Sequence, residues 1–324
     1  MLWHPPFRAF SLPGLLLLLT LGNVGFAAEP STVPPPPADV SPIKLLDADA
    51  TKLLAEVYQV NETIPLDARL VEKVSKDGIL REKIVFRGAQ GYLVPAYFQL
   101  PPEGNGPFPC VLLLHGWSGS KEHWWIDNNY ISGGNVRKAL IDRGFAIFAL
   151  DAQAHGDRIS VNDYAPVNHY NDPDQGPEQR KGYFTREEIY IQTTRDYRRA
   201  IKYLSTRPEI DSARIGLFGY SMGGAQAYLL TGSDPRIKCA VSCCAPREEN
   251  AYSPVGPQNF LSGLGDRPFL TIMGRNDELC PIGHAQAIHE LNPSTHKELI
   301  ILESGHKFPH EYVPLAVEWI RANL

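Results

Sequence analysis

The chain has 324 residues, of which 43% are hydrophobic and 21% are charged, and its formal net charge is −5. These proportions are ordinary for a globular protein, and the length suits one large domain or two small ones. No long run of one charge sign occurs. That argues against a nucleic-acid-binding surface and against a polybasic membrane patch.

The N-terminus has the pattern of an export signal. Arg8 supplies a positive charge, an apolar stretch runs from Leu12 to Val24, and Gly25 and Ala27 form a small-x-small cleavage pattern. We therefore predict a signal peptide at residues 1–27, a secreted or periplasmic protein, and no stable membrane span after cleavage. The alternative is an uncleaved anchor, for which the apolar stretch is short.

Four consecutive prolines, Pro34 to Pro37, follow the predicted cleavage site. Such a segment favours a stiff, extended conformation, so residues 28–43 are interpreted as a linker. Residues 44–324 show no internal repeat and are interpreted as one domain.

Short apolar runs recur through this domain, and each has the length of a buried strand. Continuous rather than alternating apolar runs are typical of a parallel sheet covered on both faces. The predicted strands are residues 81–86, 92–100, 110–114, 145–150, 214–218, 237–242, 269–273 and 298–302.

Helical patterns separate most of these strands. We expect helices over residues 135–143, over residues 186–204, from Pro281 to about residue 291, and near the C-terminus. Thr185 and Glu188 form a capping box at the start of the second helix. The alternation predicts an α/β protein with a doubly wound, mostly parallel β-sheet, helices on both faces and a short antiparallel start. In such sheets the active site lies at the carboxyl ends of the strands.

A candidate nucleophile follows one of these predicted strands. Residues 214–218 lead into Gly219-Tyr220-Ser221-Met222-Gly223, a G-x-S-x-G pattern between a strand and a helix. This chemistry needs a serine on a sharp turn, with small residues that allow the strand and helix to pack closely. The alternative is a glycine-rich loop that merely enters a helix.

A base and an acid candidate also follow strand ends. His306 comes after the last predicted strand and would activate the Ser221 hydroxyl, which is a poor nucleophile alone. Asp277 follows the strand over residues 269–273 and would fix the histidine tautomer. An ordinary turn aspartate is the alternative for Asp277, and Glu278 and Glu303 are fallback carboxylates.

Hydrolysis through a tetrahedral intermediate needs backbone donors for the oxyanion. The N–H of Met222, directly after the nucleophile, is one candidate. The N–H of Trp117, in the loop after the strand over residues 110–114, is the second. His115, in the same loop, is expected to brace it rather than to act in chemistry.

These motifs, in this order, resemble the α/β-hydrolase superfamily from about Arg81 to the C-terminus. The segment over residues 207–216 and the segment over residues 92–96 are similar to dienelactone hydrolase-like and acetyl xylan esterase-like members. The resemblance implies a serine hydrolase without a cofactor or metal. Two departures leave the subfamily open. Ser221 stands where dienelactone hydrolases proper use cysteine, and residues 151–156 replace the Arg-Gly-Gln motif of acetyl xylan esterases.

Aromatic residues near the motifs suggest a substrate pocket. Trp124 and Trp125 follow the oxyanion loop, and Tyr220 precedes the nucleophile. They would contact an acyl or sugar group, although packing is the alternative role. Residues 159–188 form a long insertion that is interpreted as a lid, with a surface excursion as the alternative.

Five cysteines are present: Cys110, Cys239, Cys243, Cys244 and Cys280. Export would permit disulfides, and an odd number leaves at least one thiol unpaired. We predict a bond from Cys280 to Cys243 or Cys244, with buried free thiols as the alternative. No CxxC pair occurs, so a zinc site of that type is not expected.

Three functions agree with these patterns. The first is hydrolysis of small or medium carboxylic esters, including acetylated carbohydrates, through an acyl-enzyme on Ser221. A serine peptidase or amidase on the same fold is the second, but no propeller-like repeat precedes the domain. The third is a hydrolase-like binding protein without activity, which would normally have an incomplete triad.

Overall fold

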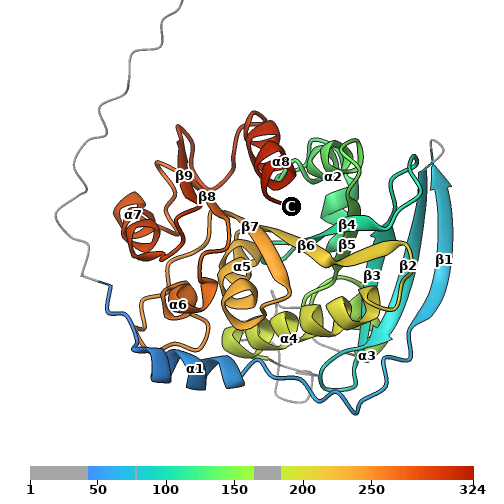
Figure 1. Ribbon diagram of the computed structural model, residues 1–324, viewed down its shortest axis with the longest axis horizontal. Helices are drawn as coiled ribbons and strands as arrows, with labels where there is room; N and C mark the ends of the chain where they lie inside the picture. Colours follow the sequence, from blue (N-terminus) through green and yellow to red (C-terminus); the bar gives the residue numbers. More distant parts are fainter. Residues whose placement is uncertain (1–42, 77–78, 164–183) are drawn as a thin grey trace, which may run out of the picture. The chain divides into compact units, whose positions relative to one another are not determined.

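The structure, a computed structural model, describes residues 43–76, 79–163 and 184–324. In these residues nine strands form a single sheet in the order β1-β2-β3-β5-β4-β6-β7-β8-β9 (Figure 1). The strands are β1 (Arg69–Lys76), β2 (Ile79–Arg87), β3 (Leu93–Gln99), β4 (Phe108–Leu114), β5 (Ala146–Leu150), β6 (Ile210–Tyr220), β7 (Ile237–Cys243), β8 (Phe269–Gly274) and β9 (Lys297–Leu302).

The sheet is parallel except at its beginning. β1, β2 and β3 pair in antiparallel fashion, and β3 is also antiparallel to β5. All pairs from β5 through β4 to β9 are parallel. The predicted doubly wound sheet with a short antiparallel start is therefore confirmed.

Helices cover both faces of the sheet. In Figure 1, α2 (Gly133–Ile141) and α8 (Tyr312–Asn323) lie above the strands, and α4 (Arg186–Leu204) and α5 (Met222–Ser233) lie below them. The remaining helices are α1 (Ala48–Glu56), η1 (Lys121–Trp125), α3 (Asp157–Asn162), η4 (Pro257–Phe260), α6 (Leu261–Leu264) and α7 (Ile282–Leu291).

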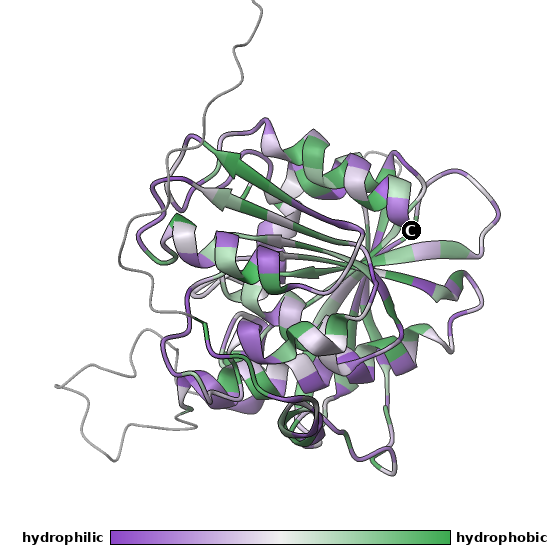
Figure 2. Cartoon of the chain, turned by 60° about the vertical axis from the view of Figure 1, so that its left-hand side comes forward, coloured by the Kyte–Doolittle hydropathy of each residue, from purple (hydrophilic) through white to green (hydrophobic). Residues whose placement is uncertain are grey.

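Alternate residues of the central strands enter the two hydrophobic layers. In β4, Leu112 and Leu114 pack with side chains of α4 and α5, and Val111 and Leu113 pack with side chains of α2 and α8. This alternation follows from the two-residue period of a strand. It explains why the central strands are apolar throughout, and Figure 2 shows them as mostly hydrophobic ribbons between the helices.

The helix over residues 186–204 begins as the sequence predicts. The Thr185 hydroxyl accepts a hydrogen bond from the Glu188 N–H, and the Glu188 carboxylate accepts one from the Thr185 N–H at 2.7 Å. This reciprocal pair satisfies two N–H groups that would otherwise lack a partner at the helix start.

The sequence patterns miss β1 and α1, as well as the short helices η1, α3, η4 and α6. β1 forms the edge of the sheet, where Leu70 and Val71 are more than half exposed. A strand that buries so little needs no continuous apolar run, so the sequence pattern does not mark it. α1 lies in a stretch that the pattern leaves without an assignment, and its N-cap is Asp47. Both β1 and α1 lie at the start of the domain, away from the strand ends that carry the site motifs.

The described residues contain no helix that is both long enough and apolar enough to cross a membrane. Residues 1–27 and 28–43, interpreted as a signal and a linker, lie almost entirely outside the described residues. The predicted lid falls mainly on residues 164–183, which also lie outside them; α3 occupies residues 157–162 and α4 begins at Arg186.

Candidate active site

Ser221 lies on a sharp turn between β6 and α5. Its backbone has φ 57° and ψ −115°, in a region that residues with side chains seldom occupy. A Cβ atom at Gly219 would lie 2.0 Å from the carbonyl oxygen of Gly223, and one at Gly223 would lie 2.1 Å from that of Leu114. Only glycine therefore allows the strand, the turn and the helix to approach this closely.

His306 and Asp277 meet Ser221 at the carboxyl edge of the sheet. His306 Nε2 lies 2.8 Å from Ser221 Oγ, and His306 Nδ1 lies 2.9 Å from Asp277 Oδ2. The three residues come from the turns after β6, β8 and β9. The structure thus brings together the three residues that the sequence nominates for a triad.

The hydrogen bonds define the histidine tautomer in this arrangement. Asp277 has a fully buried side chain, and its carboxylate also accepts a hydrogen bond from the Leu279 N–H at 2.9 Å. An ionised carboxylate only accepts, so His306 Nδ1 carries the proton and donates it. Nε2 then accepts from the Ser221 hydroxyl, which is the arrangement that can remove the hydroxyl proton during nucleophilic attack.

Backbone hydrogen bonds hold the acid and histidine loops together. The Arg275 N–H donates to the Leu302 carbonyl at 2.8 Å, and the Asn276 N–H donates to the Ser304 carbonyl at 2.9 Å. At Gly274 a Cβ atom would lie 2.2 Å from the Gly305 carbonyl oxygen. The spacing between Asp277 and His306 therefore depends on two neighbouring loops that fit only without a side chain at this point.

Tyr220 supports the histidine loop rather than lining a pocket. Its side chain is fully buried, its hydroxyl donates to the His306 carbonyl at 2.9 Å, and the same hydroxyl accepts from the Phe308 N–H. Burial raises the pKa of Tyr220 far above its ordinary value, so the phenol stays neutral. The prediction that Tyr220 contacts the substrate is corrected accordingly.

The loop predicted to supply an oxyanion donor runs beside the nucleophile. A Cβ atom at Gly116 would lie 3.2 Å from Ser221 Cβ, so the backbone before Trp117 passes close to the serine. Met222 is the first residue of α5, where an N–H has no acceptor within the helix. The oxyanion role of Trp117 and Met222 remains a prediction.

His115 braces this loop. Its Nδ1 donates to the Gly116 carbonyl at 2.8 Å, and its Nε2 accepts from the Ala152 N–H at 3.0 Å, which joins the turn after β4 to the turn after β5. Burial, followed by the nearby His155, lowers the pKa of His115 well below its ordinary value. His115 therefore stays neutral and keeps both hydrogen bonds.

A buried ion pair also joins the segment after β4 to the turn after β5. Asp151, directly after β5, accepts hydrogen bonds from the Lys121 N–H at 2.9 Å and from Lys121 Nζ at 2.8 Å. Both side chains are fully buried. The sequence offers one signal for Asp151, its position at a strand end, and none for Lys121.

The two tryptophans proposed for the pocket serve as packing residues. Trp124 is fully buried in the layer that contains Phe218, and the two ring centroids are 5.7 Å apart. Trp125 packs edge-on against Tyr97, and its Nε1 donates to Gln99 Oε1 at 3.0 Å. Both indoles therefore pack against side chains of the sheet, in β6 and in β3.

Tyr130 is a site residue that the sequence reasoning missed. Its side chain is 48% exposed, and its ring centroid lies 6.4 Å from that of His306 and 6.2 Å from that of Tyr220. Burial, followed by the nearby Cys244 and Asp277, raises the pKa of Tyr130. No motif marks this residue, because its position depends on how the loop before α2 folds over the histidine.

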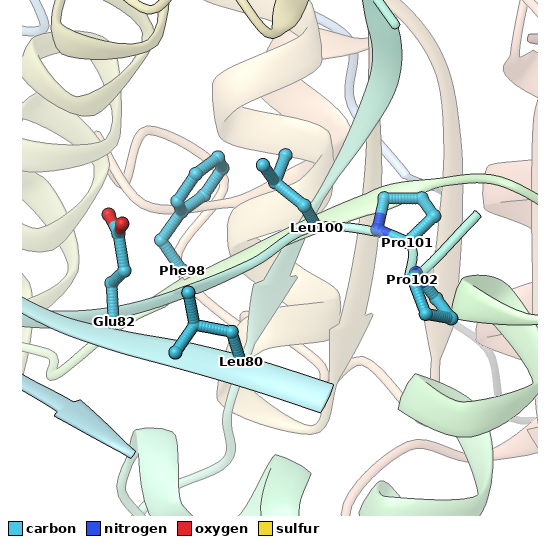
Figure 3. Close-up of a pocket in the computed structure, with 6 residues that line it drawn as sticks. All are labelled: Leu80, Glu82, Phe98, Leu100, Pro101 and Pro102. Carbon is cyan, nitrogen blue, oxygen red and sulfur yellow. The ribbon is translucent and has the colours of Figure 1, made fainter. Parts of the chain in front are cut away.

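Two hollows lie away from the triad. The first, of about 270 Å³, is lined by Leu80, Phe98 and Leu100 among others (Figure 3). It lies at the edge where β5 begins, opposite Ser221, since Gln99 pairs with Ile147. The second, of about 310 Å³, is next to α4, and its lining includes the buried Gln153.

The predicted disulfide is wrong, because all five cysteines are buried free thiols. Cys243 and Cys244 pack in the layer beneath α2 and α8. Cys280 instead packs in a small separate cluster with Met273 and Ala285. The sulfurs therefore belong to different parts of the core even though Cys244 and Cys280 lie at the same edge of the sheet.

Known proteins show similarity over most of the chain. The Bacillus subtilis protein YtaP is 24% identical over 234 residues, which cover 65% of this chain and 72% of YtaP. Esterase YjfP of Escherichia coli is 20% identical over 249 residues, which cover 67% of this chain and 90% of that protein.

Among solved structures, acetyl xylan esterase 1 from a Thermoanaerobacterium species has a TM-score of 0.62 and 18% identity, covering 85% of this chain and 93% of that one. At this identity the likeness shows the shared α/β-hydrolase fold. A model of the dienelactone hydrolase family matches residues 94–312, more than half of the chain. With its sheet topology, this match shows that the chain belongs to the dienelactone hydrolase family.

Proposed function

We propose that the protein is a serine esterase that cleaves carboxylic esters through an acyl-enzyme on Ser221. The observation that carries this proposal is the continuous hydrogen-bonded chain from Ser221 Oγ through His306 to the buried Asp277 carboxylate, with distances of 2.8 Å and 2.9 Å. Ser221 lies on the strand-to-helix turn that this fold uses for a nucleophile. Membership of a family named for the hydrolysis of a lactone, a cyclic ester, adds support.

The geometry supports a two-step reaction. Ser221 Oγ attacks the ester carbonyl carbon while His306 Nε2 takes the hydroxyl proton, and His306 then gives that proton to the departing alcohol. Water enters, loses a proton to the same nitrogen, and releases the acid. In both steps the N–H groups of Met222 and Trp117 would hold the negatively charged carbonyl oxygen.

The substrate we propose is a small or medium ester, with acetylated carbohydrate as one class. Tyr130, beside His306, and Trp117, in the loop that passes Ser221, are 48% and 39% exposed. Flat aromatic surfaces of this kind suit the apolar faces of sugar rings and short acyl groups. The structurally similar acetyl xylan esterase is named for such a substrate.

We also propose that the protein is exported and acts outside the cytoplasm. The support is the pattern of Arg8, the apolar stretch from Leu12 to Val24, and the small residues Gly25 and Ala27. N-terminal sequencing of the protein recovered from an expressing cell tests this proposal. A mature chain that begins at Ala28 is expected, and a chain that still begins at Met1 would contradict it.

The test of the esterase is hydrolysis of a panel of p-nitrophenyl esters of increasing acyl length, acetylated xylose and a prolyl amide. Wild type is compared with Ser221→Ala, and Ser205→Ala, at the exposed end of α4, is the matched control. Ester turnover should disappear in Ser221→Ala and persist in Ser205→Ala. Cleavage of the amide alone, dependent on Ser221, would support a peptidase, and inert wild type would support a binding protein.

A further inference from the structure

Cys244 lies directly behind the triad, although no step of the proposed reaction uses it. It follows β7, where the Cys243 carbonyl accepts a hydrogen bond from the Ser221 N–H at 2.8 Å. The Cys244 N–H donates to the Ile272 carbonyl at 2.8 Å, and the Cys244 backbone has φ 40°. This left-handed conformation is rare for a residue with a side chain and breaks the alternation of the strand.

The Cys244 thiol therefore shares a small space with the acid and the base. The Cys244 sulfur, a carboxylate oxygen of Asp277 and a ring nitrogen of His306 all lie within 4.8 Å of one another. Donor atoms bound to one tetrahedral Zn²⁺ lie about 3.3–3.6 Å apart, because the metal–ligand distances are about 2.0–2.3 Å. A contraction of about 1 Å, within the reach of side-chain rotation, would bring all three atoms onto one ion.

We propose that Cys244, Asp277 and His306 form a binding site for one thiophilic divalent cation, such as Zn²⁺, and that occupancy of this site blocks hydrolysis. Binding releases the thiol proton to solvent, whereas the imidazole stays neutral, and where Nδ1 is the ligand its proton moves to Nε2. A metal on His306 Nδ1 removes the hydrogen bond to Asp277, and a metal on Nε2 removes the one to Ser221. Either arrangement would block hydrolysis. The metal site stands without the proposed esterase activity, whereas the inhibition rests on it.

The set of donor atoms determines which ions fit. Thiolate, imidazole and carboxylate together suit Zn²⁺, Co²⁺ and Cd²⁺, while Mg²⁺ and Ca²⁺ require oxygen ligands in larger number. Cys244 is fully buried, and His306 is the most exposed of the three residues. The ion would enter past the imidazole, so inhibition should develop slowly rather than at once.

Direct binding is tested with Co²⁺, which gives a near-ultraviolet charge-transfer band only when a thiolate binds it. Wild type should show this band with saturation at one ion per chain, and Cys244→Ser should lack it. Cys280→Ser is the matched control, because Cys280 is also buried and lies in the Asp277 loop but outside the three-residue cluster. Ser221→Ala should keep the band, which separates metal binding from hydrolysis.

Inhibition is tested by incubating each variant with Zn²⁺ and following ester hydrolysis relative to its own metal-free rate. Wild type and Cys280→Ser should lose activity with time and recover it with a chelator. Cys244→Ser should need at least about tenfold more Zn²⁺, since even the loss of a group that only supports a ligand weakens metal binding by about 10–100-fold. Cys244→Ala serves as a second variant if Cys244→Ser fails to fold.

Two results would overturn the proposal. One is the absence of a thiolate band in folded wild-type protein at saturating Co²⁺. The other is equal Zn²⁺ inhibition of wild type and the folded Cys244 variants, which would assign the effect to the triad without the thiol. If wild type hydrolyses no ester but shows the Cys244-dependent band, the metal site stands and the proposed esterase activity fails.

Discussion

The Asp277 carboxylate accepts hydrogen bonds from His306 Nδ1 and from the Leu279 N–H, and its side chain is fully buried. An amide at this position would keep the size and lose the charge. We expect Asp277→Asn to lower kcat by about 10⁴-fold, because the imidazole would take the wrong tautomer. Steady-state kinetics on a p-nitrophenyl ester measure the change.

Glu303 provides the control for this prediction. It lies in the adjacent loop, is paired with Arg275 at 2.7 Å, and its side chain is 72% exposed. Glu303→Gln should leave kcat nearly unchanged. A larger loss in Glu303→Gln than in Asp277→Asn would show that Glu303, and not Asp277, is the acid of the triad.

Protonation of His155 is expected to make the free energy of unfolding depend on pH. It is buried, its Nδ1 donates to the Gln153 carbonyl at 2.7 Å, and burial lowers its pKa to about 4. The unfolded chain, with an ordinary histidine pKa of about 6.5, binds more protons than the folded chain between these values. Stability should therefore fall as pH falls, by about 2 kcal/mol between pH 7 and pH 5 for this residue.

Urea unfolding of wild type and His155→Gln at pH 7 and pH 5 measures this effect. The variant should lose about 2 kcal/mol less than wild type on acidification. His296→Gln is the control, because His296 is exposed on the surface. Equal pH dependence in wild type and His155→Gln would show that His155 is not held neutral in the folded protein.

Among the elements, η1 and the end of β5 are linked by a buried ion pair. Lys121, the first residue of η1, and Asp151, directly after β5, form an ion pair of 2.8 Å with both side chains fully buried. Lys121→Met leaves the Asp151 carboxylate buried without its counterion. We expect a loss of about 3–5 kcal/mol in the free energy of unfolding.

Lys202 offers the exposed counterpart. It pairs with Glu62 at 2.5 Å, and the two side chains are 38% and 54% exposed. Lys202→Met should cost less than about 1 kcal/mol, because water screens that pair. Urea unfolding of both variants makes the comparison, and similar losses would show that burial does not govern the strength of these pairs.

The element boundaries show where sequence patterns suffice. The helix over residues 186–204 was predicted with its capping box, because the cap is a local arrangement of Thr185 and Glu188. The central strands were predicted because burial on both faces requires continuous apolar runs. β1 was missed because an exposed edge strand gains its stability from its pairing with β2, which leaves little trace in its own residues.

For the whole molecule, the parallel sheet gathers the site at one edge. Ser221, Asp277 and His306 follow three strands, and the only strand between them in the sheet is β7. The loop that contains His115 and the residues that brace it also lie within the described domain. We therefore expect the protein without residues 1–42, which keeps Ile43 packed against the core, to keep the kcat/KM and Tm of the chain without residues 1–27. A clear drop in either quantity would assign residues 28–42 a part in the fold or the site.

The sequence by itself determined the fold class, the order of the parallel strands along the chain, and the three residues that meet at the strand ends. These depend on local patterns: apolar runs, turns and the residue that follows each strand. Only the tertiary structure decided which aromatics face the site, that the cysteines stay unpaired, and that Cys244 and Tyr130 lie beside the triad. Those outcomes depend on how loops distant in the chain pack against one another, and packing between distant segments leaves no periodic signal in the residues of either one.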